Sequence, residues 1–142
     1  MKIVLASDHG GFELKELITK RFANDGREFV DVGCTSLDSV DYPDFAEKAV
    51  AKITSGECEK GILICGTGIG MSIAANRHRE IRAANCFDEY TVKMSREHNN
   101  ANVLCLGARV LSADTALKMV DIWLATEFGG GRHQRRIAKF SD

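Results

Sequence analysis

Five short apolar runs separated by helix-like segments constrain the fold of this chain more than any other feature. They occupy residues 3–7, 29–33, 61–65, 82–87 and 103–107. Strand-like runs that alternate regularly with helical patterns are typical of βαβ units, in which parallel strands are covered by helices. The sequence therefore predicts an α/β protein with a five-stranded parallel sheet. With 142 residues, 44% of them hydrophobic, the chain fits one domain, residues 1–142, with a normal core.

Helical signals fill the segments between the runs. Apolar residues recur at helical spacing in three of these segments: Phe12, Leu17, Ile18 and Phe22; Phe45, Ala49, Val50 and Ile53; and Leu117, Val120, Trp123 and Leu124. Pro43 is placed to open the second of these helices, and Ser112 is placed to cap the third. Three glycines, residues 129–131, are expected to end the third helix and to lead into a basic helix over about 131–140.

Charge and cysteine usage exclude several classes of partner and location. The formal net charge is −1, which argues against a nucleic-acid partner. The five cysteines are an odd number without a CxxC pair, so we expect neither a disulfide framework nor a metal site, and a cytoplasmic location is the simplest account. The short apolar run after Met1 is interrupted by Asp8, unlike a signal peptide. No apolar stretch is long enough to span a bilayer, so we expect no membrane association.

A thiol leads directly into a glycine-rich turn at the end of the third run. Cys65 is followed by Gly66, Gly68 and Gly70. Glycines let the backbone approach a ligand closely, and free N–H groups at a helix start attract anions and favour the thiolate of a neighbouring cysteine. The pattern predicts a nucleophile or base beside a site for negative charge on a substrate oxygen.

Two other interpretations of this turn stay open. A free cysteine is commonly a small buried hydrophobe, in which case Cys65 serves only in the core. The glycines also invite a dinucleotide-binding interpretation. Their spacing, GxGxG, differs from the GxGxxG fingerprint, and they do not follow the first strand, so this match is weak.

Polar side chains follow four of the five predicted strands. They are Asp8 and His9 after the first, Asp41 and Tyr42 after the second, Cys65 and Thr67 after the third, and Arg109 after the fifth. In open parallel sheets, ligands bind beyond the carboxyl ends of the strands. We therefore expect these residues to gather on one edge of the sheet.

Two further polar clusters lie elsewhere in the chain. His98 stands among the amide side chains of residues 95–102, where an imidazole could transfer protons near neutral pH; an ordinary loop histidine is the alternative. Arg132 and Arg136 are four residues apart, on one face of a helix, a spacing that suits a phosphate or a carboxylate. A solvated run of charges is the alternative for these arginines.

Taken together, these motifs resemble a known family of enzymes. Segments 7–12, 39–44, 65–76 and 95–109, with Gly130, Arg132 and His133, are similar in order and spacing to the type B ribose-5-phosphate isomerases of the ribose/galactose isomerase family. The similarity covers essentially the whole chain. It implies a Rossmann-like three-layer α/β/α sandwich, a homodimer whose active sites draw on both subunits, and no metal or organic cofactor. Whether dimers pair further stays open.

The resemblance also implies roles around the cysteine turn. By match to the family's motifs, Cys65 takes the C2 proton of the open-chain sugar, and Thr67 helps to hold the thiolate. The resemblance places the enediolate oxygen on the backbone around Gly66, Gly68, Ile69 and Gly70, together with Asn99. A free thiol with a pKa near 8.5 is largely protonated at neutral pH, so we expect the helix start to lower it.

The remaining matched residues are expected to open the sugar ring and to bind the substrate phosphate. The resemblance matches His98 to ring opening, assisted from the side of Asp8 and His9, and it matches Arg132 and Arg136 to a phosphate clamp contributed by the partner subunit. Tyr42 and Arg109 are the other residues expected to bind substrate. An aldose-ketose isomerisation needs no hydride acceptor, in keeping with the missing dinucleotide fingerprint.

Three functions compete at this point. Interconversion of ribose 5-phosphate and ribulose 5-phosphate leads, because Cys65 fits the ribose-type members of the family better. Isomerisation of a six-carbon aldose 6-phosphate, such as allose 6-phosphate, would use the same residues in a longer pocket. A module that binds a phosphosugar without chemistry is the third. A thiol hydrolase has less support, because the sequence offers no evident oriented set of cysteine, histidine and acid.

Overall fold

The sheet has five strands, all parallel, as the alternation of apolar runs predicts. The computed structural model describes all 142 residues. Its strands are β1 (Lys2–Ser7), β2 (Glu28–Asp31), β3 (Lys60–Cys65), β4 (Ala83–Asn85) and β5 (Val103–Gly107). They are ordered β2-β1-β3-β5-β4, so the topological switch point, where the strand order reverses, lies between β1 and β3. In open sheets of this kind, ligands bind beside such a reversal.

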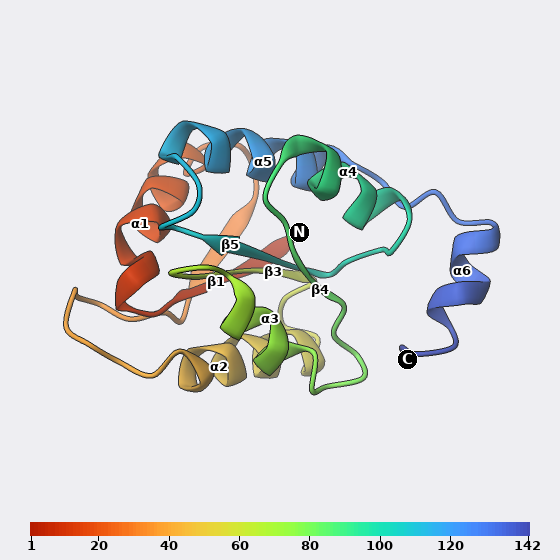
Figure 1. The fold of residues 1–142 in the computed structure, drawn as a ribbon, viewed down its shortest axis with the longest axis horizontal. Coiled ribbons are helices and arrows are strands. Elements are labelled where there is room, and N and C mark those ends of the chain that lie inside the picture. Colours follow the sequence, from red (N-terminus) through yellow and green to blue (C-terminus); the bar gives the residue numbers. More distant parts are fainter.

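Helices on both faces of the sheet make the three layers of an α/β/α sandwich. They are α1 (Phe12–Arg21), preceded by the 3₁₀ turn η1 (His9–Gly11), α2 (Tyr42–Thr54), α3 (Ile69–Ala75), α4 (Glu89–Glu97), α5 (Ala113–Ala125) and α6 (Arg132–Ile137). In Figure 1, α1, α4 and α5 cover one face of the sheet and α2 and α3 cover the other. The short α6 stands apart from both layers, beyond the tip of α4.

Each face of the sheet has its own apolar core. One core lies under α1, α4 and α5 and contains the fully buried Trp123 and Met119. The other lies under α2 and α3 and contains Met71, Cys65 and Cys105. The predicted helix signals are confirmed at two ends: Ser112 Oγ accepts the Thr115 N–H at 3.2 Å, and Pro43 lies in the first turn of α2.

Both edge strands are shorter than the predicted runs. The run 29–33 becomes β2 at Glu28–Asp31; beyond its end the Val32 N–H still donates to the Leu5 carbonyl oxygen, and the Asp31 carboxylate accepts the Gly33 N–H at 2.8 Å. The run 82–87 becomes β4 at Ala83–Asn85. Side chains take the backbone N–H groups at its two ends: Asn102 Oδ1 accepts from Arg82, and Thr91 Oγ1 accepts from Phe87.

The apolar stripe predicted for the first helix is wrong at one position. Leu17 is 42% exposed, whereas Leu14, Ile18 and Phe22 are buried. Positions 14, 18 and 22 are spaced by four residues and share one face of the helix, and residue 17 is about 100° away from residue 18 around the axis. The basic helix predicted over about 131–140 is likewise shorter, at Arg132–Ile137. None of the helices is both long enough and apolar enough to cross a membrane.

Candidate active site

The polar residues expected on one edge of the sheet do meet there. A hollow of about 420 Å³ lies beyond the carboxyl ends of β1 and β3. Its lining residues are Asp8, Tyr42, Cys65, Gly66, Thr67, Ile69, Gly70, Ile73 and Arg109. They come from segments that follow four different strands in the chain. The convergence predicted from the strand order is confirmed for all of the predicted residues except Asp41 and His9, which do not line this hollow.

Cys65 is the last residue of β3 and reaches the hollow from the edge of the core. It is 5% exposed. The Gly68 N–H donates a hydrogen bond to Cys65 Sγ, with N and S 3.1 Å apart. A donor at this position orients the sulfur and interacts more strongly with it when the sulfur carries negative charge.

The glycine turn owes its shape to Gly68. Its φ of +80° lies in the left-handed region that glycine adopts without strain. A β-carbon at Gly68 would also collide with Asn85 Oδ1 and lie 3.0 Å from the carbonyl carbon of Leu106. Gly68 therefore directs its N–H toward Cys65 Sγ. Its positive φ and the lack of room for a β-carbon both require glycine at this position.

Unpaired backbone donors surround the thiol. The N–H groups of Gly66, Thr67 and Gly70 have no acceptor within the chain. The Thr67 hydroxyl oxygen accepts the Ile69 N–H at 3.2 Å, so Thr67 orders the turn, and the bond to the Cys65 sulfur comes from Gly68 instead. Free donors at such a turn can bind an anionic oxygen.

Asp8 and His9 are fixed by backbone hydrogen bonds. Asp8 Oδ1 accepts the Gly11 N–H at 3.2 Å and caps η1. The Val40 N–H donates to His9 Nδ1 at 3.2 Å. A neutral imidazole that accepts at Nδ1 carries its proton on Nε2, so His9 offers a donor at that nitrogen.

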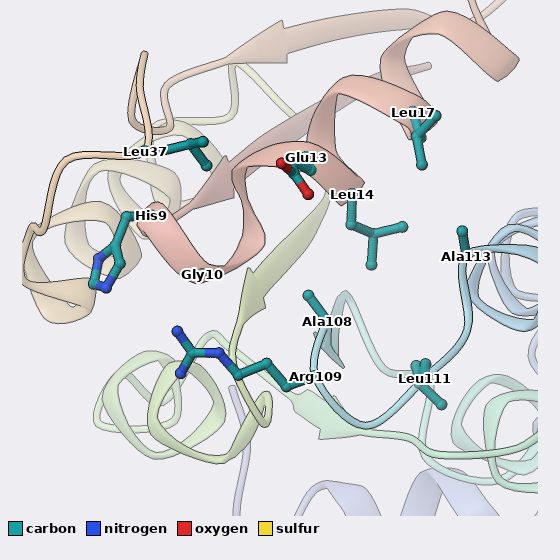
Figure 2. A pocket seen from close by; sticks show the side chains of 10 residues that line it. All are labelled: His9, Gly10, Glu13, Leu14, Leu17, Leu37, Ala108, Arg109, Leu111 and Ala113. Atoms are coloured by element: carbon teal, nitrogen blue, oxygen red, sulfur yellow. The ribbon is translucent and has the colours of Figure 1, made fainter.

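Tyr42 and Arg109 close over the glycine turn. A β-carbon at Gly70 would lie 2.6 Å from the Tyr42 ring, so the ring rests directly on the backbone of Gly70. A β-carbon at Gly66 would lie 3.0 Å from Arg109 Nη1. Figure 2 shows the Arg109 guanidinium directed toward His9 and Gly10; Arg109 and His9 also line a neighbouring hollow of about 390 Å³.

His98 and Asn99 lie at the opposite end of the sheet. They follow α4 and precede β5, so they stand where the strands begin, whereas Cys65 and Arg109 stand where the strands end. The five residues of β5 separate the two ends by about 16 Å. His98 and Asn99 line two other hollows, which share no residue with the hollow at Cys65.

His98 packs against the start of α6. Its ring stacks on that of His133, with centroids 4.3 Å apart and planes inclined by 17°. Burial, then the charges of His98, Arg132 and Arg136, lower the pKa of His133. The neutral form of His133 is therefore favoured.

Arg132 and Arg136 lie on α6 at the predicted four-residue spacing. Both are exposed, and neither forms an ion pair within the chain. They too are absent from the hollow at Cys65. One chain thus presents two groups of predicted site residues, one around Cys65 and one around His98, and does not bring them together.

Sequence reasoning missed two residues beside Cys65. Ile73 lines the hollow, and its position one turn after Ile69 on α3 was the signal available for it. Asn85 packs against Gly68 from the end of β4. No sequence signal marks Asn85, because its position depends on how β4 pairs with β5.

Comparison with known proteins gives a consistent result. Residues 3–140 match the model of a family described as Ribose/Galactose Isomerase. A ribose-5-phosphate isomerase B of Escherichia coli is 44% identical over 136 residues, which cover 96% of this chain and 91% of that protein. A putative sugar phosphate isomerase of Bacillus subtilis is 49% identical over 143 residues, covering 100% of this chain and 96% of the relative.

Solved structures agree over nearly the whole fold. Ribose-5-phosphate isomerase B of Clostridium thermocellum superposes with a TM-score of 0.96 at 53% identity, covering 98% of this chain and 94% of that one. Ribose-5-phosphate isomerase B of Mycoplasma genitalium, solved with bound ribulose-5-phosphate, gives a TM-score of 0.93 at 43% identity, covering 97% and 92%.

Proposed function

This chain belongs to the ribose/galactose isomerase family and interconverts D-ribose 5-phosphate and D-ribulose 5-phosphate, and we propose that Cys65 is the base of this reaction. The observation that carries the proposal is the position of its sulfur. Cys65 Sγ faces a hollow lined by polar groups and accepts the N–H of Gly68. No other cysteine of the chain lines this hollow.

The isomerisation needs a base and a site for an anionic oxygen. The thiolate of Cys65 removes the proton from C2 of the open-chain aldose, and the electron pair moves onto the carbonyl oxygen to give an enediolate. A proton then passes from the C2 hydroxyl to the C1 oxygen, and return of a proton to C1 completes the ketose. The free N–H groups of Gly66, Thr67 and Gly70 lie where they can stabilise the developing negative charge.

We also propose that the active site is shared between two subunits of a homodimer. His98, Asn99, Arg132 and Arg136 stand beyond the amino ends of the strands, too far from Cys65 to act on the same sugar within one chain. In a two-fold dimer, the group around Cys65 of one subunit can face the group around His98 of the other. Ile69 and Ile73, 54% and 56% exposed beside the hollow, supply apolar surface for such a contact.

Within this shared site, His98 of the partner subunit opens the sugar ring. Arg132 and Arg136 of the partner subunit bind the phosphate, for which their exposed, unpaired guanidinium groups are suited. Asp8, His9, Tyr42 and Arg109 bind the sugar from the side of Cys65. The five unpaired cysteines support a cytoplasmic location.

Hydrogen exchange in heavy water tests the function directly. The protein is incubated with ribose 5-phosphate, and separately with allose 6-phosphate, while ketose formation and deuterium at C2 of the recovered aldose are followed. We expect ribulose 5-phosphate to form, deuterium to enter at C2, and the specificity constant to favour the five-carbon sugar. Binding without exchange would mean a phosphosugar-binding module, and a preference for allose 6-phosphate would mean a six-carbon isomerase.

A further inference from the structure

Two arginines of this chain are withdrawn from solvent without a carboxylate partner. Arg96 is 4% exposed, and Arg82 is half-buried. Every hydrogen bond that their guanidinium groups make goes to a neutral oxygen. Removing a guanidinium from water is costly, and an apolar side chain of similar volume often serves stability as well or better. Two such groups close together therefore call for an explanation beyond packing.

Both arginines hold the same residue. Arg82 Nε donates to the Asn100 carbonyl oxygen at 2.9 Å, and Arg96 Nη1 donates to Asn100 Oδ1 at 3.0 Å. Asn100 has a φ of +45° and is the only non-glycine residue of the chain in the left-handed region. It directly follows His98 and Asn99, so its conformation sets how these two side chains leave the end of α4.

The same arginines also hold the two ends of the segment that carries α6. At its start, Arg96 Nε donates to the Thr126 carbonyl oxygen at 3.1 Å. At its end, Arg82 Nη1 donates to Ser141 Oγ at 2.9 Å, and the Ser141 hydroxyl donates in turn to the Arg79 carbonyl oxygen. Ser141 is 7% exposed. Between these two anchors α6 stands away from the layers of the fold, as Figure 1 shows.

We propose that Arg82 and Arg96 are positioning residues that hold the His98–Asn99 turn and the arginines of α6 in one fixed arrangement. The proposal rests on the proposed function, in which these four residues act on the sugar phosphate. Arg82 links the turn at Asn100 to the end of the α6 segment, and Arg96 links the same turn to its start. The ring-opening group and the phosphate clamp thereby reach the substrate as a single preorganised unit.

The test removes the partners of the two arginines and leaves the arginines in place, because loss of a buried guanidinium could unfold the protein. Ser141→Ala deletes the acceptor of Arg82 at the end of the α6 segment. Asn100→Gly accepts the left-handed φ but deletes the Oδ1 that Arg96 holds, and Asn100→Asp restores an oxygen there. Ser112→Ala, which removes the cap of α5, is the matched serine control.

Ser141→Ala should loosen the phosphate clamp. We expect KM for ribose 5-phosphate and the inhibition constant of inorganic phosphate to rise about three- to tenfold, with kcat within about twofold. Ser112→Ala should lower Tm without changing KM. A KM that stays at the wild-type value in Ser141→Ala, or that moves equally in Ser112→Ala, overturns the role of Arg82.

Asn100→Gly should instead slow the step that His98 performs. We expect kcat to fall about three- to tenfold with KM little changed, and Asn100→Asp to recover most of the loss. Equal kcat in the wild type and Asn100→Gly, or no recovery in Asn100→Asp, overturns the role of Arg96.

The double variant Arg132→Ala/Arg136→Ala separates this proposal from the proposed function. If it raises KM while Ser141→Ala does not, the clamp stands and the positioning role fails. If it leaves KM unchanged, the clamp itself is wrong, and the positioning role of Arg82 falls with it.

Discussion

Cys65 differs from the other cysteines of the chain in what surrounds its sulfur. Burial raises the pKa of the Cys58, Cys86 and Cys105 thiols, which favours their inert protonated form. Cys65 is also largely buried, yet its sulfur accepts a backbone N–H from Gly68 and borders a hollow. The sequence left open a core position and a reactive role for this residue; the structure places Cys65 in a core cluster, and its reactive role stays a proposal.

Replacing Cys65 by alanine should nearly abolish isomerisation and leave the fold intact. Removal of a general base typically costs about 10²–10⁴-fold in rate. Steady-state kinetics on ribose 5-phosphate, with circular dichroism as the check on folding, measures this. Cys58→Ala is the matched control, because Cys58 lies before β3, at the other end of the strand from Cys65, and should keep most of the activity. Wild-type turnover in Cys65→Ala would falsify the assignment of the base.

At His98, the expected change depends on the length of the sugar. Ribose 5-phosphate is mainly cyclic in water, whereas D-erythrose 4-phosphate cannot close a furanose ring through its phosphorylated oxygen. If His98 opens the ring, His98→Asn should slow turnover of ribose 5-phosphate by about 10²-fold or more and largely spare the shorter sugar. Comparison of kcat/KM for both sugars in wild type and variant gives the answer. Equal losses on the two substrates would instead place His98 in the transfer of the C2 proton or in the architecture of the site.

At the scale of elements, all five strands could be predicted, but the bounds of the two edge strands, β2 and β4, could not. β1, β3 and β5 are buried strands, and their continuous apolar runs match the observed bounds within one residue. β2 and β4 have one neighbour each, and side chains accept backbone N–H groups just outside them: Asp31 accepts from Gly33 after β2, and Asn102 accepts from Arg82 before β4. The pattern of apolar residues indicates which segments are buried, but it does not indicate these local hydrogen bonds between side chains and the backbone.

A pair of glycine substitutions separates the effect of a left-handed backbone conformation from the effect of a steric clash. Gly68 and Gly56 have nearly equal φ values, +80° and +81°, but a β-carbon at Gly56 meets nothing within 4 Å. Each change to alanine should cost about 1–2 kcal/mol of stability for the left-handed conformation. Gly68→Ala must also displace Asn85 or the turn that holds Cys65, so it alone should lose most of its kcat. Thermal unfolding and kinetics on both variants measure the two effects, and equal kcat in the two would mean that the shape of this turn is not needed for catalysis.

For the whole molecule, strand order predicted which polar residues gather at the carboxyl ends of the strands, but it did not predict where His98 and α6 lie. Residues that follow strands, such as Asp8, Cys65 and Arg109, meet at one edge because all strands are parallel. His98 follows a helix and precedes a strand, and in a βαβ unit that connection lies at the opposite edge. The same reasoning applied to residues 98–102 could have predicted the separation. The placement of α6 beyond the tip of α4 has no such signal, because it depends on buried contacts of Arg82 and Arg96.

Subunit mixing tests whether the two halves of the site meet across a dimer. Cys65→Ala and the double variant Arg132→Ala/Arg136→Ala are each expected to be nearly inactive alone. In a hybrid dimer, one of the two sites combines an intact Cys65 with intact arginines, and the other carries both defects. Random reassociation makes half of the dimers hybrid, so about a quarter of wild-type activity should return.

Differently tagged subunits verify the exchange, and each variant taken alone through the same exchange is the control. If activity stays at the level of the separate variants although hybrid dimers are present, each site is built within one chain, and the separation of Cys65 from α6 would have to be closed by a movement of α6 within its own subunit.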